Sequence, residues 1–165
     1  LSSFKYHKNL LEIPNIIKNI DHINLQWTII GDKIQKKYFQ IFINKIKKLN
    51  LEKNIIVIKK ISENKKINLF KNSDLYVQLS HSEGFCIPIL EARMNGLNVV
   101  SSNCGAAKEI FLDLNGSLAR SHDTVVFSKL IVKNLFKEQK VNKFKFKNWS
   151  WNTKIKKLII LYNEL

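Results

Sequence analysis

Cysteine, proline and glycine, which cross-link the chain, restrict it or make it flexible, are scarce in this sequence. Its 165 residues include two cysteines, two prolines and five glycines. Two cysteines cannot build the disulfide framework of a small secreted domain, and no Cys/His cluster has the spacing of a zinc site. So few prolines and glycines exclude collagen-like and linker sequences. These absences favour a folded protein of a reducing compartment, and we expect a cytoplasmic location.

Long apolar runs and acidic residues are also in short supply. No stretch of about 18 uncharged apolar residues is present, so the sequence predicts no membrane-spanning segment. Lys and Arg total 28 against 13 for Asp and Glu, which gives a formal net charge of +15. Such a surplus is typical of a solvated lysine surface, but it also attracts phosphate on a nucleotide, a nucleic acid or an anionic lipid. Because nucleic-acid readers favour arginine, and only Arg93 and Arg120 are present, we expect no nucleic-acid partner.

Apolar residues alternate between two spacings along the chain. They make up 45% of it, which is enough for one domain with a sizeable core. Short continuous runs predict buried strands over residues 25–31, 55–58, 74–79, 99–101 and 117–119. Helical periodicity predicts helices over residues 10–20, 34–49, 64–72, 88–95, 106–111, 124–138 and 151–162, with Ser62 near the start of one. The alternation indicates a Rossmann-like α/β fold, a doubly wound parallel sheet that binds ligands beyond the carboxyl ends of its strands.

The loop after the strand predicted at 74–79 carries the most informative pattern. Glu83 stands near the end of this strand, and Gly84 follows where backbone can approach a ligand closely. Pro88 suits the first turn of a helix, and Glu91 lies about one turn further along. Free N–H groups at a helix start can hold a diphosphate, and carboxylates accept hydrogen bonds from sugar hydroxyls. The pattern fits a nucleotide sugar, or equally a helix with a surface glutamate and a capping loop.

Residues 83–110 resemble a known family in order and spacing. The resemblance is to the donor-site signature of group 1 (family 4) glycosyltransferases of the GT-B fold, and it rests on Glu83-Gly84-Phe85, Pro88, Glu91-Ala92, Gly96, Val99-Val100-Ser101, Gly105 and Glu109-Ile110. The family places two glutamates with seven residues between them, and Glu83 and Glu91 keep that spacing. Cys86 and Asn98 depart from the family pattern, which usually has Gly and Pro there. Weaker likeness extends over nearly the whole chain.

The resemblance implies catalytic roles for two charged residues. Glu83 would lie against the donor sugar, and Lys8 would neutralise the leaving diphosphate as its bond to the sugar breaks. Lys5 is the second candidate for that cation and is expected to bind the donor. Because lysine supplies the positive charge, this chemistry implies neither a metal ion nor another cofactor, and the nucleotide-diphosphate sugar is a substrate.

The resemblance also implies a set of donor-binding residues. Glu91 would bind the ribose hydroxyls of the nucleotide. Gly84 and Phe85 would offer backbone N–H groups to the sugar or the diphosphate. The base would lie against Lys60 and Ile61, just after the second predicted strand. The donor would be linked to UDP or GDP, and the sequence does not distinguish between them.

GT-B enzymes have two domains, and this chain resembles one of them. Residues 1–165 would form the C-terminal, nucleotide-sugar-binding domain with its first strand truncated, and the acceptor-binding N-terminal domain would be absent. We therefore expect an incomplete part of a retaining, metal-independent transferase. Its acceptor would be a sugar, a glycan or a lipid-linked molecule of cell envelope glycan biosynthesis. Lysines within residues 34–49 would allow peripheral contact with the inner face of the membrane.

A second function class stays open from the sequence. The chain would then be a basic α/β module that binds nucleic acid or an anionic membrane without transferase activity. No aromatic–basic pattern of an RNA-binding module is present. The two hypotheses differ in their ligand, because a transferase half binds UDP or GDP, whereas a nucleic-acid module prefers polymer and loses it steeply with salt.

Overall fold

Strands and helices alternate along the chain as its apolar spacing predicts. The computed structural model describes residues 4–31, 35–114 and 116–137, together with 150, 152–153, 155–156 and 159–160. The strands are β1 (Trp27–Ile30), β2 (Ile55–Ile58), β3 (Leu75–Gln78), β4 (Asn98–Ser102) and β5 (Ser117–Ala119). Two short 3-10 helices, η1 (Tyr6–Lys8) and η2 (Leu10–Glu12), precede α1 (Ile13–Asn19), α2 (Lys36–Lys48), α3 (Glu63–Lys71), α4 (Ile87–Met94), α5 (Ala107–Leu114) and α6 (Thr124–Leu135). The helix predicted over 151–162 lies largely outside the described residues.

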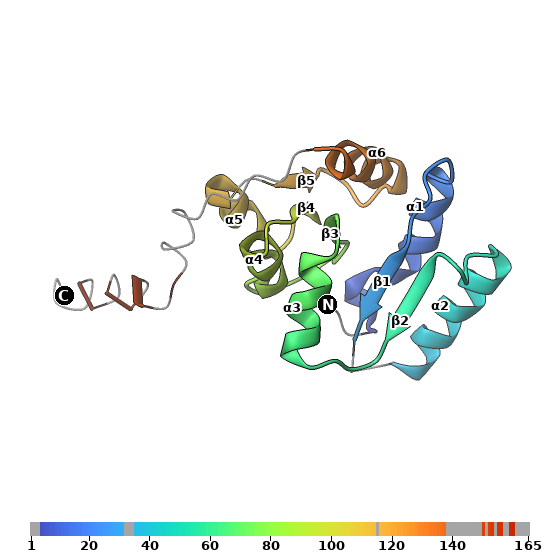
Figure 1. Ribbon diagram of the computed structural model, residues 1–165, viewed down its shortest axis with the longest axis horizontal. Helices are drawn as coiled ribbons and strands as arrows, with labels where there is room; N and C mark the ends of the chain where they lie inside the picture. Colours follow the sequence, from blue (N-terminus) through green and yellow to red (C-terminus); the bar gives the residue numbers. More distant parts are fainter. Residues whose placement is uncertain are drawn as a thin grey trace.

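The strand pairs are all parallel. β1 pairs with β2, and β4 pairs with β3 on one side and β5 on the other. The strands predicted at 74–79 and 99–101 lie side by side in one sheet, with Leu75 opposite Asn98 and Gln78 opposite Ser101. The arrangement differs from one continuous sheet, because the described strands form a two-stranded and a three-stranded sheet (Figure 1). A cavity separates β1 from β3.

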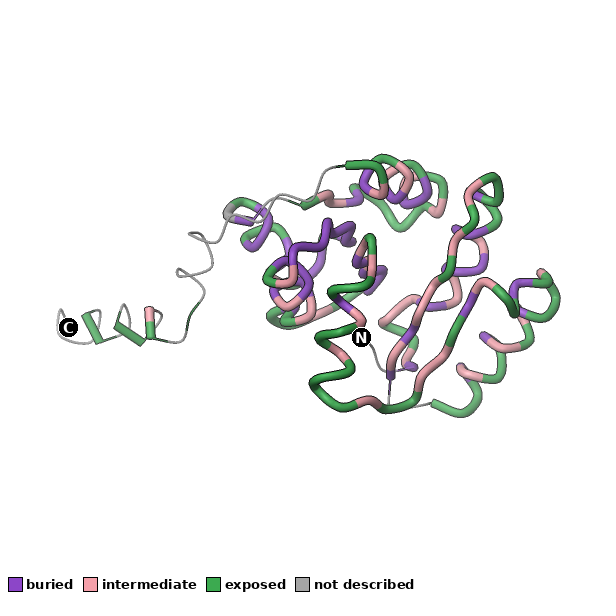
Figure 2. Tube along the Cα trace, viewed as in Figure 1, coloured by how far each residue is buried: buried purple, intermediate pink, exposed green. Residues whose placement is uncertain are grey.

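Helices cover the three-stranded sheet on both faces. Successive side chains of a strand point to opposite sides. Tyr76 and Val99 accordingly pack with α4 and α5, whereas Leu79 and Val100 pack with α1 and α6. Every residue of β4 is buried, and Figure 2 shows buried residues gathered around this sheet. A continuous buried run is typical of a parallel strand between two helical layers.

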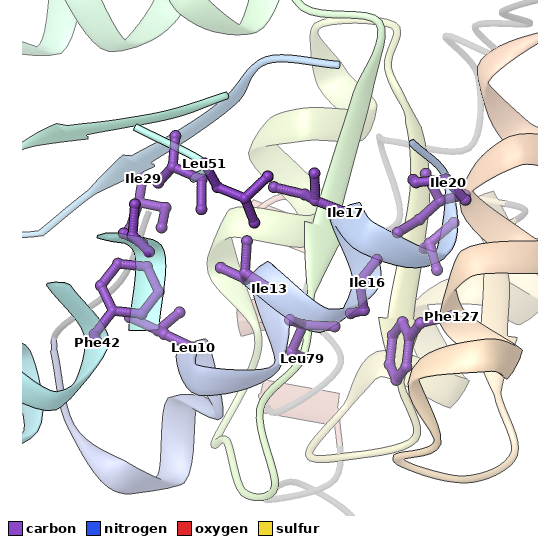
Figure 3. Packing of buried hydrophobic residues seen from close by; sticks show 14 of the residues in the cluster. Leu10, Ile13, Ile16, Ile17, Ile20, Ile29, Phe42, Leu51, Leu79 and Phe127 are labelled. Carbon is purple, nitrogen blue, oxygen red and sulfur yellow. The ribbon is translucent and has the colours of Figure 1, made fainter. Parts of the chain in front are cut away.

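Helix α1 joins the two sheets into one core. In Figure 3 its Ile13 lies toward Ile29 of β1, and its Ile16 lies toward Leu79 and Phe127 of α6. These residues belong to a single cluster of buried apolar side chains. Burying one large aliphatic side chain contributes about 1.5–3 kcal/mol, so the apolar face of α1 is a main link between the sheets.

Local sequence sets where the helices begin. Ser62 accepts a hydrogen bond from the Lys65 N–H at 3.4 Å, which confirms the predicted cap of α3. Pro88 lies in the first turn of α4, where its missing N–H costs no hydrogen bond. The helix predicted from residue 10 begins as the 3-10 turn η2 and becomes α-helical at Ile13.

Candidate functional site

The loop between β3 and α4 lies at the carboxyl edge of the three-stranded sheet. It ends at Cys86, which precedes α4 with a left-handed φ of 61°. The Ala106 N–H donates to the Gly84 carbonyl oxygen at 3.1 Å and so ties this loop to the one between β4 and α5. The two loops therefore meet beside the start of α4, the positive end of the helix dipole, which attracts anions.

Two glycines in these loops serve different purposes. Gly105 has a φ of +53°, and a Cβ there would run into the Gly84 carbonyl oxygen and lie 2.8 Å from that of Glu83. A larger residue does not fit without moving the loops. Gly84, by contrast, has nothing within 4 Å of where its Cβ would be. This side of the loop is open for a ligand to approach the backbone.

The structure brings Lys8 and Glu83 together across 75 residues of sequence. The Lys8 Nζ lies 2.6 Å from the Glu83 Oε1, and the two side chains are 17% and 16% exposed. The Ser80 hydroxyl donates a second hydrogen bond to the same oxygen at 2.5 Å. Because little water surrounds this ion pair, its attraction is stronger than that of a surface pair, and it holds the Glu83 carboxylate in place beside the loop.

Backbone contacts carry Lys8 to this position. The His7 carbonyl oxygen accepts a hydrogen bond from the His81 N–H at 2.8 Å, which joins η1 to the loop after β3. The Phe4 carbonyl oxygen accepts one from the Gln35 N–H at 3.0 Å, just before α2. Residues 4–8 thus lie across the carboxyl ends of both sheets, where the Lys8 ammonium reaches Glu83.

Glu91 sits in α4 and is held by a different lysine. Lys66 of α3 lies 2.8 Å from the Glu91 Oε1 and 2.6 Å from the Glu63 Oε2. Burial by itself would lower the pKa of Lys66, but the hydrogen bonds to Glu63 and Glu91 outweigh it and raise that pKa. The charged ammonium fixes the Glu91 carboxylate, whose side chain stays 29% exposed to a ligand.

Lys66 and Ser80 are contacts that the sequence analysis missed. Lys66 is 25 residues from Glu91, and nothing distinguishes it from the other lysines of a lysine-rich chain. Ser80 is three residues before Glu83, and that short spacing was the one signal of a hydrogen bond within the loop. Ser80 directs its hydroxyl to Glu83 and not to His81, as expected for neighbouring residues at a strand end.

The other predicted donor-binding residues lie around this edge outside the two ion pairs. Gly84 is exposed, and the Phe85 side chain is 48% exposed. Lys5 precedes η1, and Lys60 and Ile61 lie between β2 and α3. Within the described part of the chain, no side-chain hydrogen bond links these three residues to the glutamates. Their roles stay predictions.

Two buried thiols lie beneath the loop. The Gln78 Nε2 of β3 lies 3.5 Å from the Cys86 Sγ and 3.7 Å from the Cys104 Sγ. Hydrogen bonds, the larger from the Cys86 thiol and a smaller one from Ser102, lower the pKa of Cys104 despite its burial. The same contact, and then burial, raises the pKa of Cys86. Cys86 is 4% exposed, so the side chain that stands where the family usually has glycine points inward and leaves the ligand side free.

A histidine pair at this edge was not predicted. The ring centroids of His81 and His122 lie 4.1 Å apart, with the rings tilted by 51°. Burial, and then the nearby His81, lowers the pKa of His122. Since 41 residues separate them in the sequence, no local spacing could have indicated the contact, and the lowered pKa favours a neutral His122 ring at pH 7.

The charges at this edge suit an anionic ligand that carries hydroxyl groups. Lys8 and Lys66 supply cations, the start of α4 supplies the positive end of its helix dipole, and Glu83 and Glu91 supply acceptors. Among the described residues, no three His, Cys, Asp or Glu side chains lie close enough together to hold a metal ion. No helix in that same part of the chain is long and apolar enough to cross a membrane.

Known proteins are similar to this chain over most or all of its length. Protein CapJ of Staphylococcus aureus is 33% identical over 130 residues, which cover 74% of this chain and 32% of CapJ. A glycosyltransferase from Rickettsia africae ESF-5 has the same fold, with a TM-score of 0.85 and 20% identity over 99% of this chain and 46% of that one. Anabaena Alr3699/HepE in complex with UDP aligns with a TM-score of 0.80 and 18% identity over 100% of this chain and 48% of that one.

The chain therefore spans about a third of the curated relative and under half of these solved structures. Likeness at such low identity to the solved structures shows the fold, which is that of GT-B glycosyltransferases. The family model of the group 1 glycosyl transferases matches residues 1–158. Since this match covers most of the chain, the chain belongs to the group 1 glycosyl transferases.

Proposed function

We propose that residues 1–165 form the nucleotide-sugar-binding, C-terminal domain of a GT-B glycosyltransferase. One observation carries the proposal: the Lys8–Glu83 pair, 2.6 Å apart, lies beside the start of α4, and Glu91 follows about one turn into that helix. The whole enzyme transfers a sugar from a UDP- or GDP-linked donor to a sugar, a glycan or a lipid-linked acceptor.

Each part of a nucleotide sugar finds matching chemistry at this edge. The diphosphate lies against the start of α4 and the exposed backbone of Gly84 and Phe85. Glu91 accepts hydrogen bonds from the ribose hydroxyls, and Lys66 keeps its carboxylate in place. The base lies near Lys60 and Ile61, since α3 follows them directly and carries Lys66 to Glu91. The UDP bound to HepE supports a uridine nucleotide.

The reaction breaks the bond between the sugar C1 and a diphosphate oxygen and forms a bond from C1 to an acceptor oxygen, whose proton passes to the departing diphosphate. Lys8, with Lys5 as the second cation, neutralises the charge that grows on the leaving diphosphate. Glu83, released from Lys8, holds the hydroxyls of the donor sugar. The proposed reaction uses lysine in place of a metal ion, and the resemblance to a mostly retaining family supports retention at C1.

The acceptor site belongs to the other domain in this proposal. Relatives twice as long support it, because this chain spans under half of the solved structures. The exposed lysines of α2, among them Lys36, Lys37, Lys47 and Lys48, are suited to the inner face of an anionic membrane that presents a lipid-linked acceptor. The proposed location is the cytoplasm, with peripheral membrane contact and a role in cell envelope glycans.

Calorimetric titration of UDP and GDP into the chain and two matched variants tests the donor site. Glu91→Gln keeps the size of the side chain but removes the charge that strengthens hydrogen bonds to ribose, a loss of about 1.5–3 kcal/mol. Nucleotide affinity should therefore fall about 10- to 150-fold. Glu63→Gln is the control, because Glu63 also binds Lys66 but is 79% exposed, and it should keep its affinity.

Two results would count against the proposal. Equal affinity in the Glu91→Gln variant and the parent, with the fold intact, would reject the role of Glu91. If neither nucleotide binds, and nucleic acid binds with a steep salt dependence, the alternative of a basic binding module is correct.

A further inference from the structure

Both cysteines of the chain come together under the two loops of the site. Cys86 ends the β3–α4 loop, and Cys104 lies in the β4–α5 loop, 18 residues further along. The Cys86 Sγ lies 3.4 Å from the Cys104 carbonyl oxygen and is hydrogen-bonded to the Cys104 thiol. The Gln78 Nε2 lies within 3.7 Å of both sulfur atoms. The two thiols therefore form one cluster, with a hydrogen-bond donor that they share.

Cys86 is held in this cluster in a strained conformation. Its φ of 61° is left-handed, a region that glycine adopts freely and that strains a residue with a Cβ. The side chain is buried, and a Cβ at Gly105 would lie 3.0 Å from the Cys86 Sγ. Backbone strain of this kind is concentrated at functional sites. Glycine would relieve the strain, so the thiol itself is the feature that calls for a function.

The surroundings make the two thiols chemically unequal. Hydrogen bonds from Cys86 and Ser102 lower the pKa of Cys104, whereas the contact with Cys104, and then burial, raises the pKa of Cys86. The Ser102 Oγ lies 3.4 Å from the Cys104 Sγ. Because the thiolate is the nucleophile, Cys104 reacts first, and Cys86 keeps its proton until a partner forms beside it. Such a pair consists of an attacking and a resolving thiol.

We propose that Cys86 and Cys104 are a reversible oxidation site, at which hydrogen peroxide joins the β3–α4 loop to the β4–α5 loop through a disulfide. The Cys104 thiolate attacks one oxygen of the peroxide, the O–O bond breaks, and Cys104 becomes a sulfenic acid. The other oxygen leaves as hydroxide and takes the proton of the Cys86 thiol, which makes water.

The second step forms the disulfide. The Cys86 thiolate attacks the Cys104 sulfur and displaces its hydroxide, which takes up the proton that Cys104 had released and becomes a second water. Two thiols are thereby oxidised, and one hydrogen peroxide is reduced to two waters. A dithiol reductant reverses the change by exchange and is itself left as a disulfide.

Burial of the pair limits what can react with it. Cys86 is 4% exposed and Cys104 is 8% exposed, so an oxidant as small as hydrogen peroxide suits the site. The thiols of a second chain cannot reach sulfur atoms that are buried to this extent. The disulfide therefore forms within one chain, and in the proposed cytoplasmic location it is transient, as a redox-sensing bond is.

The disulfide also acts on the proposed donor site. Ser102 donates to the Ser80 carbonyl oxygen at 2.5 Å, and the Ser80 hydroxyl donates to Glu83. An S–S bond of about 2 Å is shorter than a thiol hydrogen bond, so it draws the loops together where the Glu83 and Gly84 carbonyl oxygens already crowd Gly105. We expect UDP to bind about tenfold more weakly to the oxidised chain. This consequence rests on the proposed function, whereas the oxidation site does not.

Titration of the reduced chain with hydrogen peroxide tests the site without any nucleotide. Free thiols are counted with a thiol-reactive dye after unfolding, and peptides are mapped by mass spectrometry without reduction. We expect one equivalent of peroxide to remove both thiols, to link Cys86 to Cys104 in a monomer, and a dithiol reductant to restore them. Calorimetry with UDP then compares the reduced and oxidised chains.

Two matched variants separate the roles of the thiols. Cys86→Gly suits the left-handed φ and leaves Cys104 without a resolving thiol. Peroxide should then leave Cys104 as a sulfenic acid, which a 1,3-diketone traps. Cys104→Ser keeps only the Cys86 thiol, which should be lost at least about tenfold more slowly than the thiols of the parent chain.

Three outcomes would overturn the oxidation site. One is a folded parent chain that resists peroxide while the unfolded chain reacts, since the thiols would then be packing groups; this readout needs no variant to fold. Another is disulfides that form only between chains. The third is thiol loss in Cys104→Ser as fast as in the parent, which would overturn the order of attack.

The UDP measurement distinguishes this proposal from the proposed function. Equal affinity of the reduced and oxidised chains for UDP would overturn the effect of the disulfide on the donor site. UDP that binds neither form would count against the proposed function, and the peroxide titration would still decide the oxidation site.

Discussion

The two sheets differ in how completely they are buried. All five residues of β4 in the three-stranded sheet are buried, with helices on both faces. In the two-stranded sheet, β2 has one buried residue, Ile55, and Ile56 is 38% exposed. Both sheets end at the same edge, yet the loops that carry Glu83 and Gly105 follow strands of the buried sheet.

This difference shows where the site obtains its geometry. The Gly105 loop leaves β4, which is buried throughout, and the Glu83 loop leaves β3, which pairs with β4 and buries Tyr76 and Gln78. Functional groups on packed elements hold their positions better than groups on mobile ones. The two-stranded sheet contributes through the helix that comes after β2, because α3 carries Lys66 to Glu91. The three-stranded sheet sets the position of Glu83, Glu91 and the two loops, and the two-stranded sheet leads to the helix that supplies the Lys66 ammonium.

The largest expected effect comes from emptying the core behind the site. Ile89 of α4 is 0% exposed, and Ile89→Ala should lower the free energy of unfolding by about 2–5 kcal/mol through lost burial and a cavity. Ile56→Ala in the open sheet should cost less than about 1 kcal/mol. Urea unfolding followed by circular dichroism measures both. Similar losses in the two variants would contradict the difference between the sheets.

A smaller effect, on ligand binding, is expected when the Lys8 ammonium beside the three-stranded sheet is removed. Lys8→Met takes away the ammonium 2.6 Å from Glu83 and should weaken UDP or GDP binding by about 1.5–3 kcal/mol. Lys5→Met is the matched control and should lose less, because Lys5 precedes η1 and leaves the ion pair intact. Calorimetry measures both affinities. A larger loss in Lys5→Met would reverse the assignment of the two lysines.

The two loop glycines separate stability from binding. Gly105→Ala places a Cβ at a left-handed residue against the Gly84 carbonyl oxygen and should lower the free energy of unfolding by about 1–2 kcal/mol. Gly84→Ala should leave that energy within about 0.5 kcal/mol, since its Cβ meets open space, but it should weaken nucleotide binding. Thermal unfolding and calorimetry test the pair. Unchanged affinity in Gly84→Ala would show that the ligand does not approach this backbone.

The smallest expected effect is a shift in titration. Cys86→Ala removes the thiol whose hydrogen bond lowers the pKa of Cys104, so that pKa should rise. Thiolate absorbance at 240 nm, followed against pH, reports the change. Cys104→Ser is the control and should abolish this titration. An unaltered midpoint in Cys86→Ala would mean that another group sets the pKa.

Apolar spacing predicts the strands of this fold well, because buried runs such as residues 55–58 stand out among lysines and asparagines. Strand ends are less predictable: β1 begins at Trp27 and not at residue 25, since backbone pairing sets the end of a strand and hydrophobicity does not. The division into two sheets leaves no trace in local spacing either. It depends on which distant strands pair, and on a cavity between β1 and β3 that no described strand fills.

The candidate site was predictable in its residues more than in its contacts. The motif around Glu83 and Glu91 is local, so their spacing in the sequence is enough to find them. The meeting of Lys8 with Glu83 depends on the backbone contact between His7 and His81, which only the tertiary fold creates. Lys66 could not be chosen from the sequence for the same reason.

Backbone amide chemical shifts during a titration with UDP test the central claim most directly. The claim is that the β3–α4 and β4–α5 loops of the three-stranded sheet bind the nucleotide diphosphate. The account predicts the largest shifts at Gly84, Phe85 and Gly105, saturating with added UDP, and little change in β2. Shifts spread over the lysines of α2, without saturation and without change at the two loops, would contradict it.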